Sequence, residues 1–203
     1  MIGNYTASQT SQWMRRPLCR RYVCAEFKTL HLPVRDGDTV RRVGWRWALG
    51  LFKQGQYEVL GVWPAQLAPG LVAEDLHDRG IEQIKVIAGT GQAEWVSTYP
   101  DAVIWSSAGG TASENPPAPA PGAFGPRRRA TLHSAAATAE RLQACMTRAI
   151  QRHPPFEDEA AAAAFLAQAL ERADRRLHSP PKALIGRPPS VPAAGSAVAA
   201  SAA

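Results

Sequence analysis

A chain of 203 residues has room for one domain with extensions or for two small domains. Its 23 lysines and arginines exceed its 17 acids, and the resulting net charge of +6 favours nucleic acid, anionic membrane surfaces or acidic partners. No apolar run reaches the roughly 18 residues that cross a bilayer, and the first residues lack the apolar stretch of a secretion signal, so we expect a cytoplasmic protein without a membrane partner.

Composition divides the chain into five regions. Residues 1–22 form a polar, basic arm, and residues 23–107 hold five of the six tryptophans and have the patterning of a folded core. A linker rich in proline, glycine and alanine follows at 108–126. Residues 127–178 have the periodicity of two alanine-rich helices, and residues 179–203 form a low-complexity tail that we expect to be disordered.

Within the core region the hydrophobic periodicity predicts strands that alternate with turns and then with a helix. A helix with an apolar face is expected between Pro69 and Gly80. The predicted strands cover residues 27–34, 43–52, 57–63, 84–88 and 102–105. Three strands linked by hairpins, a helix and two further strands indicate an α/β fold with a sheet of mixed direction.

Five short motifs follow one another along this region. They are VRDG at 34–37, ALG at 48–50, EVLGVW at 58–63, DLHDRG at 75–80 and YPDA at 99–102. In this order the motifs resemble the catalytic domain of Mutator-type bacterial insertion-sequence transposases. The resemblance implies an incomplete ribonuclease H-like mixed sheet, followed here by the linker and an α-helical hairpin.

The catalytic positions of that family do not carry acids in this sequence. The family uses two aspartates and a glutamate to hold two divalent metal ions for phosphodiester transfer. Its first aspartate position falls on Lys28 and its second on Gly89, and no acid beyond the linker aligns with the glutamate. Glu26 is the alternative for a displaced first ligand, because it lies on the same face of a strand as Lys28.

The resemblance therefore implies a transposase-like protein that has lost catalysis, a remnant of an insertion-sequence enzyme. We expect no catalytic residues and no bound metal, with Mg²⁺ or Mn²⁺ relevant only to an intact active site. The alternative is a non-catalytic DNA-binding or protein-interaction module derived from such an enzyme. Self-association through residues 131–178 is a further hypothesis.

Clustered arginines are the candidate DNA contacts, because they neutralise phosphates independently of sequence. They are Arg41, Arg42, Arg127, Arg128 and Arg129. Arg46 is expected to join a half-exposed basic face with Arg41 and Arg42, opposite Trp45 and Trp47.

Two other features have a functional and an ordinary interpretation. Cys19, Cys24 and His31 are candidate zinc ligands, but their spacing matches no compact zinc motif and ordinary thiols are the alternative. The tryptophans of the core region are candidates for base stacking, and packing in the core is the alternative.

Overall fold

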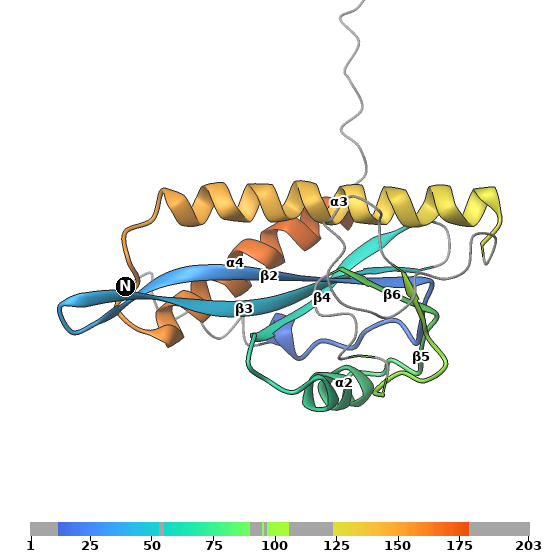
Figure 1. The fold of residues 1–203 in the computed structure, drawn as a ribbon, viewed down its shortest axis with the longest axis horizontal. Coiled ribbons are helices and arrows are strands. Elements are labelled where there is room, and N and C mark those ends of the chain that lie inside the picture. Colours follow the sequence, from blue (N-terminus) through green and yellow to red (C-terminus); the bar gives the residue numbers. More distant parts are fainter. Residues whose placement is uncertain (1–11, 53–54, 90–94, 96, 106–123, 179–203) are drawn as a thin grey trace, which may run out of the picture.

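The computed structural model describes residues 12–52, 55–89, 95, 97–105 and 124–178. It is a mixed α/β fold built on a five-stranded sheet of order β4-β3-β2-β6-β7, which confirms the predicted mixed sheet. Two long helices cover one face of the sheet, and a short helix lies on the other face (Figure 1). The elements are β1 (Arg21–Tyr22), β2 (Cys24–Asp36), β3 (Thr39–Leu51), β4 (Tyr57–Pro64), α2 (Pro69–Asp78), β5 (Gln83–Ile84), β6 (Val86–Gly89), β7 (Val103–Trp105), α3 (Pro126–Gln151) and α4 (Glu159–His178).

The first half of the sheet is antiparallel. Strands β2 and β3 form a long hairpin in register from Cys24↔Leu51 to Asp36↔Thr39, and Gly37 supplies the positive φ of its turn. Strand β4 pairs antiparallel with β3, and the register shifts between Ala48 and Leu49. All three strands cover the ranges that the periodicity predicted, except that β3 ends one residue earlier, at Leu51.

The second half of the sheet is parallel to β2. After α2 the chain returns so that β6 lies beside β2, with Phe27 opposite Gly89, and β7 then adds outside β6. The sequence predicted one strand at 84–88, but the chain divides it at Lys85. Its first part, β5, pairs with β1 in a separate two-stranded sheet, and only its second part joins the main sheet.

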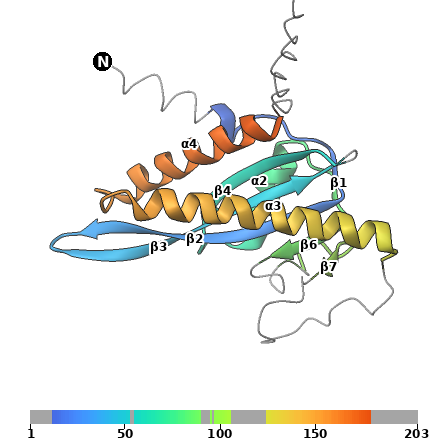
Figure 2. The ribbon, with the colours of Figure 1, turned by 90° about the horizontal axis from the view of Figure 1, so that it is seen from above.

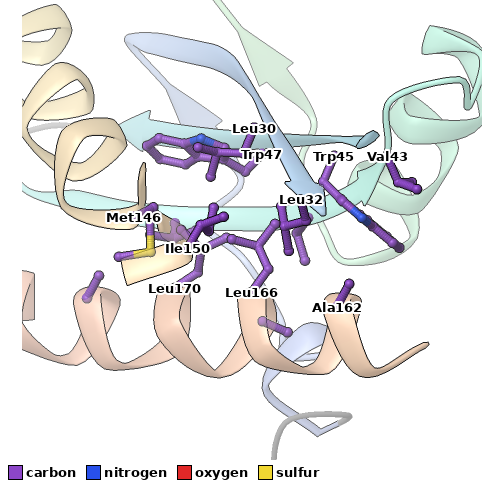
Figure 3. Packing of buried hydrophobic residues seen from close by; sticks show 14 of the residues in the cluster. Leu30, Leu32, Val43, Trp45, Trp47, Met146, Ile150, Ala162, Leu166 and Leu170 are labelled. Atoms are coloured by element: carbon purple, nitrogen blue, oxygen red, sulfur yellow. The ribbon is translucent and has the colours of Figure 1, made fainter. Parts of the chain in front are cut away.

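The main core lies between the sheet and the two long helices. Alternate residues of the hairpin, among them Leu32 and Trp47, point toward these helices and contact their apolar faces (Figure 3). Many of the helix residues in this core are alanines, so the large side chains that fill its volume come mainly from the sheet. The other face of the sheet packs Phe27 and Trp95 in a stacked pair above Val72 and Leu76 of α2.

The helical region and residues 12–22 of the expected basic arm pack on the sheet, and residues 1–11 of that arm lie outside the described residues. Helix α3 lies across β2, and α4 lies along β4 (Figure 2). From the expected arm, Trp13, Leu18 and Tyr22 are buried. The tail at 179–203 and the expected linker, apart from residues 124–126, lie outside the described residues.

No helix in the described ranges combines the length and the apolar character that a membrane crossing requires.

Candidate functional site

Lys28 stands between two carboxylates on the face of the sheet that α3 covers. Its ammonium nitrogen lies 3.3 Å from Oε1 of Glu26, two residues back along β2, and 2.5 Å from Oε1 of Glu140 on α3. The strand periodicity places Glu26 and Lys28 on one face, as predicted. Helix α3 is fixed beside them, because Gln143 donates to the backbone oxygen of Thr29 and accepts from the Trp47 indole.

Burial and the neighbouring charges have opposite effects on the pKa values of Glu26 and Lys28. Burial raises the pKa of Glu26 above its ordinary value, and the neighbouring Lys28 only partly offsets this effect. Burial alone would lower the pKa of Lys28, but the hydrogen bond to Glu140 and the charges of both carboxylates raise it. Lys28 therefore remains an ammonium at neutral pH. It is the counter-ion of Glu26, whose Oε2 is buried without a hydrogen-bond partner among the described residues.

Gly89, at the second acid position that the resemblance implies, is packed too closely to accept a side chain. It has φ of +100°, and a Cβ built on it would lie 1.8 Å from the backbone oxygen of Phe27. The parallel register sets this contact, because Phe27 is the residue opposite Gly89. An acid here requires a change in the backbone, and not only in the side chain.

The residues at these positions do not fit a divalent-metal centre. Mg²⁺ and Mn²⁺ take oxygen ligands, whereas the space between Glu26 and Glu140 holds a cationic nitrogen that occupies one oxygen of each. In the parts of the chain that the structure describes, no group of three histidine, cysteine or acidic side chains is placed to hold a metal.

The candidate zinc ligands lie apart. Cys24 and His31 are seven residues apart in one continuous strand, which separates them by about 23 Å. Cys24 is buried against α3, and burial raises the pKa of its thiol. Cys19 and His31 are exposed, so the three side chains do not converge.

Two of the three hairpin arginines have the exposure that was expected. Arg41 and Arg42 are both exposed, and Arg41 is also paired with Glu159 at the start of α4 and with Asp36. The expectation for Arg46 was wrong. It is buried, its guanidinium lies 5.4 Å from the centre of the Trp95 ring, and it donates to the backbone oxygen of Leu67. Gly44 and Ala48, its neighbours on that face, have no bulk to displace it toward solvent.

The three adjacent arginines start α3 and point in different directions. Arg128 lies over the ring of Phe124, with 4.7 Å from the guanidinium carbon to the ring centre. Arg127 and Arg129 are exposed. The five tryptophans of the core region are all buried, so packing explains them.

Glu140 is the residue of the site that sequence reasoning missed. It lies 112 residues from Lys28 in the chain, and the length of the intervening segment does not reveal which turn of α3 will face β2. The apolar faces of both long helices, the motivation for self-association through 131–178, are buried against the sheet.

Comparison with protein-family models finds no family that matches this chain, and comparison with curated proteins finds none similar in sequence.

Proposed function

We propose that this chain is a transposase-related protein of ribonuclease H-like fold that associates with DNA in the cytoplasm and does not catalyse strand transfer. In this proposal it is an inactive remnant of a Mutator-type insertion-sequence transposase. In the main sheet, three consecutive antiparallel strands, then a helix and two parallel strands, follow in the order that the resemblance implies. The parallel pairing of β2 with β6 places the two expected acid positions, Lys28 and Gly89, on adjacent strands, which supports their common origin in one site.

The observation that carries the proposal is the position of Lys28 between Glu26 and Glu140. A helix after the sheet brings a glutamate to the strand that the resemblance assigns to the first aspartate, as an acid triad requires. At the centre of this arrangement stands a fixed organic cation. An ammonium group neutralises the carboxylates as a metal ion would, but it has no open coordination position for water or a phosphate oxygen. Lys28 thus compensates the charge of the carboxylates as a metal ion would, but it cannot support phosphodiester transfer.

The alternative, a non-catalytic DNA-binding module, is supported by the charge of α3. This helix has five arginines and one glutamate, a net charge of +4, against +6 for the whole chain. Both candidates have an inactive site and associate with DNA; they differ in whether this association is left over from an enzyme or is the function of the protein.

The test is a cleavage and strand-transfer assay of the full chain on a duplex that carries an element end, with Mg²⁺ and with Mn²⁺. We expect no product in either metal. A product that requires the metal and disappears in Glu26→Gln would contradict the proposal, since it would show a working carboxylate site. The flanking genomic DNA gives an independent check, because terminal inverted repeats, or the missing acid-bearing segment in another reading frame, are expected of a remnant.

A further inference from the structure

Helix α3 concentrates positive charge on its outer face. Its large buried side chains Leu132, Met146 and Ile150 pack with residues of the sheet. The opposite side of the helix has four arginines at intervals of 14, 7 and 4 residues, which are close to whole numbers of helical turns. They are Arg127, Arg141, Arg148 and, at the C-cap, Arg152. We call these four residues the α3 stripe.

The α3 stripe is straight and open. Helix α3 runs without a break along the length of the sheet, and the view from above shows no described element over it (Figure 2). All four arginines are exposed. The side chains between them are small, among them Ala130, Ala137 and Ala144, so a flat or convex partner can approach the helix closely.

The described residues do not neutralise the positive charge of the stripe. Among them no carboxylate lies within ion-pair distance of any of its four arginines, and Arg141 donates to Oγ1 of Thr138. Glu140, the one acid in α3, is bound to Lys28. After the helix, Glu159 is paired with Arg41, and Asp158 accepts a hydrogen bond from the backbone nitrogen of Ala161 at the start of α4.

We infer that the α3 stripe is a binding surface for the phosphate backbone of double-stranded DNA, an inference that rests on the DNA association proposed above. At 1.5 Å per residue the stripe is about 38 Å long, slightly more than one turn of the duplex. Its arginines are about 21, 10 and 6 Å apart along the helix axis, and the DNA grooves are about 12 and 6 Å wide. Long arginine side chains at these intervals reach phosphates on both borders of a groove.

The chemistry of the stripe favours DNA over other anionic partners. A helix that inserts into a membrane surface needs large apolar side chains next to its basic face, but those of α3 are buried in the core. A stable protein interface needs a central apolar or aromatic anchor, and the side chains between these arginines are small. Of the two glutamines of α3, Gln143 is bonded to Trp47 and Thr29, and Gln151 lies about 100° around the helix from Arg152, so we expect binding that does not depend on base sequence.

The experiment measures binding of the full chain to a fluorescent duplex longer than α3, by anisotropy at neutral pH over a series of salt concentrations. The variant R141Q/R148Q/R152Q removes three charges from the stripe. The control R35Q/R172Q/R176Q removes three charges from exposed arginines of the hairpin and α4 that are not among the candidate DNA contacts. The variant R141K/R148K/R152K keeps the charges, and circular dichroism checks that every variant is folded.

We expect the stripe variant to bind roughly ten-fold or more weakly, with a salt slope smaller by about 2.7, because each lost phosphate contact contributes about 0.9. The control and the lysine variant should bind as the unaltered chain does. Equal loss in the control, or loss in the lysine variant, overturns the inference. Binding by the unaltered chain that the stripe variant retains also overturns it but leaves DNA association standing. If the chain does not bind the duplex and binds phosphatidylserine vesicles instead, both the inference and the proposed DNA association fail. The proposed loss of catalysis is tested separately, by the cleavage assay.

Discussion

The carboxylate of Asp174, near the end of α4, accepts a 2.7 Å hydrogen bond from the backbone nitrogen of Val59 in the edge strand β4. The guanidinium of Arg16 donates to the backbone oxygen of the same Val59 at 2.6 Å and to Asp174 at 3.1 Å. Two side chains from opposite ends of the chain thus bind both outward-facing backbone groups of one edge residue. The edge is closed at this point to pairing with another strand.

Replacement of Asp174 by alanine should destabilise the fold by about 3–5 kcal/mol, because it leaves the buried Val59 nitrogen, the Trp13 indole and Arg16 without their acceptor. Urea unfolding measures this loss. The matched control is Asp158→Ala, which removes an exposed N-cap of α4 and should cost about 1 kcal/mol. Similar losses in the two variants would show that Asp174 acts only as another helix residue.

Replacement of Lys28 by methionine should cost about 2–4 kcal/mol at neutral pH, because it leaves the Glu26 carboxylate buried without its counter-ion. Burial raises the pKa of Glu26, so its stabilising form in this variant is the protonated one, and the deficit should shrink as the pH falls through that pKa. Urea unfolding as a function of pH checks both effects.

The double variant E26Q/K28M removes both charges and should recover most of that loss. Glu140→Gln is the control on the other partner. Its side chain is 63% exposed, so the change should cost well under 1 kcal/mol. A double variant no more stable than K28M alone would contradict the counter-ion role.

Gly89→Ala should destabilise the protein by at least about 3 kcal/mol, since its methyl group meets the Phe27 carbonyl and its φ is unfavourable for an L-residue. Gly37→Ala provides the control. Gly37 also has a positive φ, of +59°, but a Cβ there would have open space, so its cost should be about 1 kcal/mol. Thermal unfolding compares the two variants, and equal shifts would mean that β2 and β6 separate more easily than this register implies.

Tyr22 and Tyr99 should ionise only when the protein unfolds in alkali. Burial raises the pKa of Tyr99 to about 12. Burial, together with the hydrogen bond that Tyr22 donates to Glu58, raises the pKa of Tyr22 far above its ordinary value. The raised pKa values stabilise the fold fully below about pH 10, the ordinary pKa of tyrosine. This stabilisation is lost as the pH rises above that value, so tyrosinate absorbance and loss of circular dichroism should rise together in the alkaline range.

The matched variants for this titration are Tyr22→Phe and Tyr57→Phe. The first removes a buried donor from Glu58 and should cost about 1–3 kcal/mol. The second removes a hydroxyl that contacts Ser134 at the surface and should cost less than about 0.5 kcal/mol. Ionisation of Tyr22 well before unfolding would show that its environment is more open than the structure indicates.

Periodicity in the sequence was sufficient to predict the strands, the short helix and the mixed sheet, because alternation along β2 and β3 follows directly from which face is buried. It was insufficient for the division at Lys85, since a buried apolar run has the same pattern in one strand or in two. The helical region was expected to have a thin, alanine-dominated face. That face gains its packing from the sheet, where Trp45 and Trp47 supply the volume that small residues such as Ala162 lack.

The candidate site shows the same limit. The sequence shows that Lys28 and Gly89 are not acids and that Glu26 shares a face with Lys28. It does not show the positive φ of Gly89 or the arrival of Glu140, because both depend on how distant segments meet. Among the arginines, angular position around the helix groups Arg127 with Arg141 and Arg148, whereas the run of three neighbours drew attention to Arg128 and Arg129, which point elsewhere.

The order of the core layers has a consequence for synthesis of the chain. The apolar face of the hairpin and β4 is complete once residue 62 has been made, but its cover ends only with α4 at His178. At about 5–20 residues per second the nascent chain carries this face uncovered for roughly 6–23 s. A chain whose synthesis stops before α4 therefore has Trp45 and Trp47 without their full cover, and such exposed apolar surface promotes aggregation.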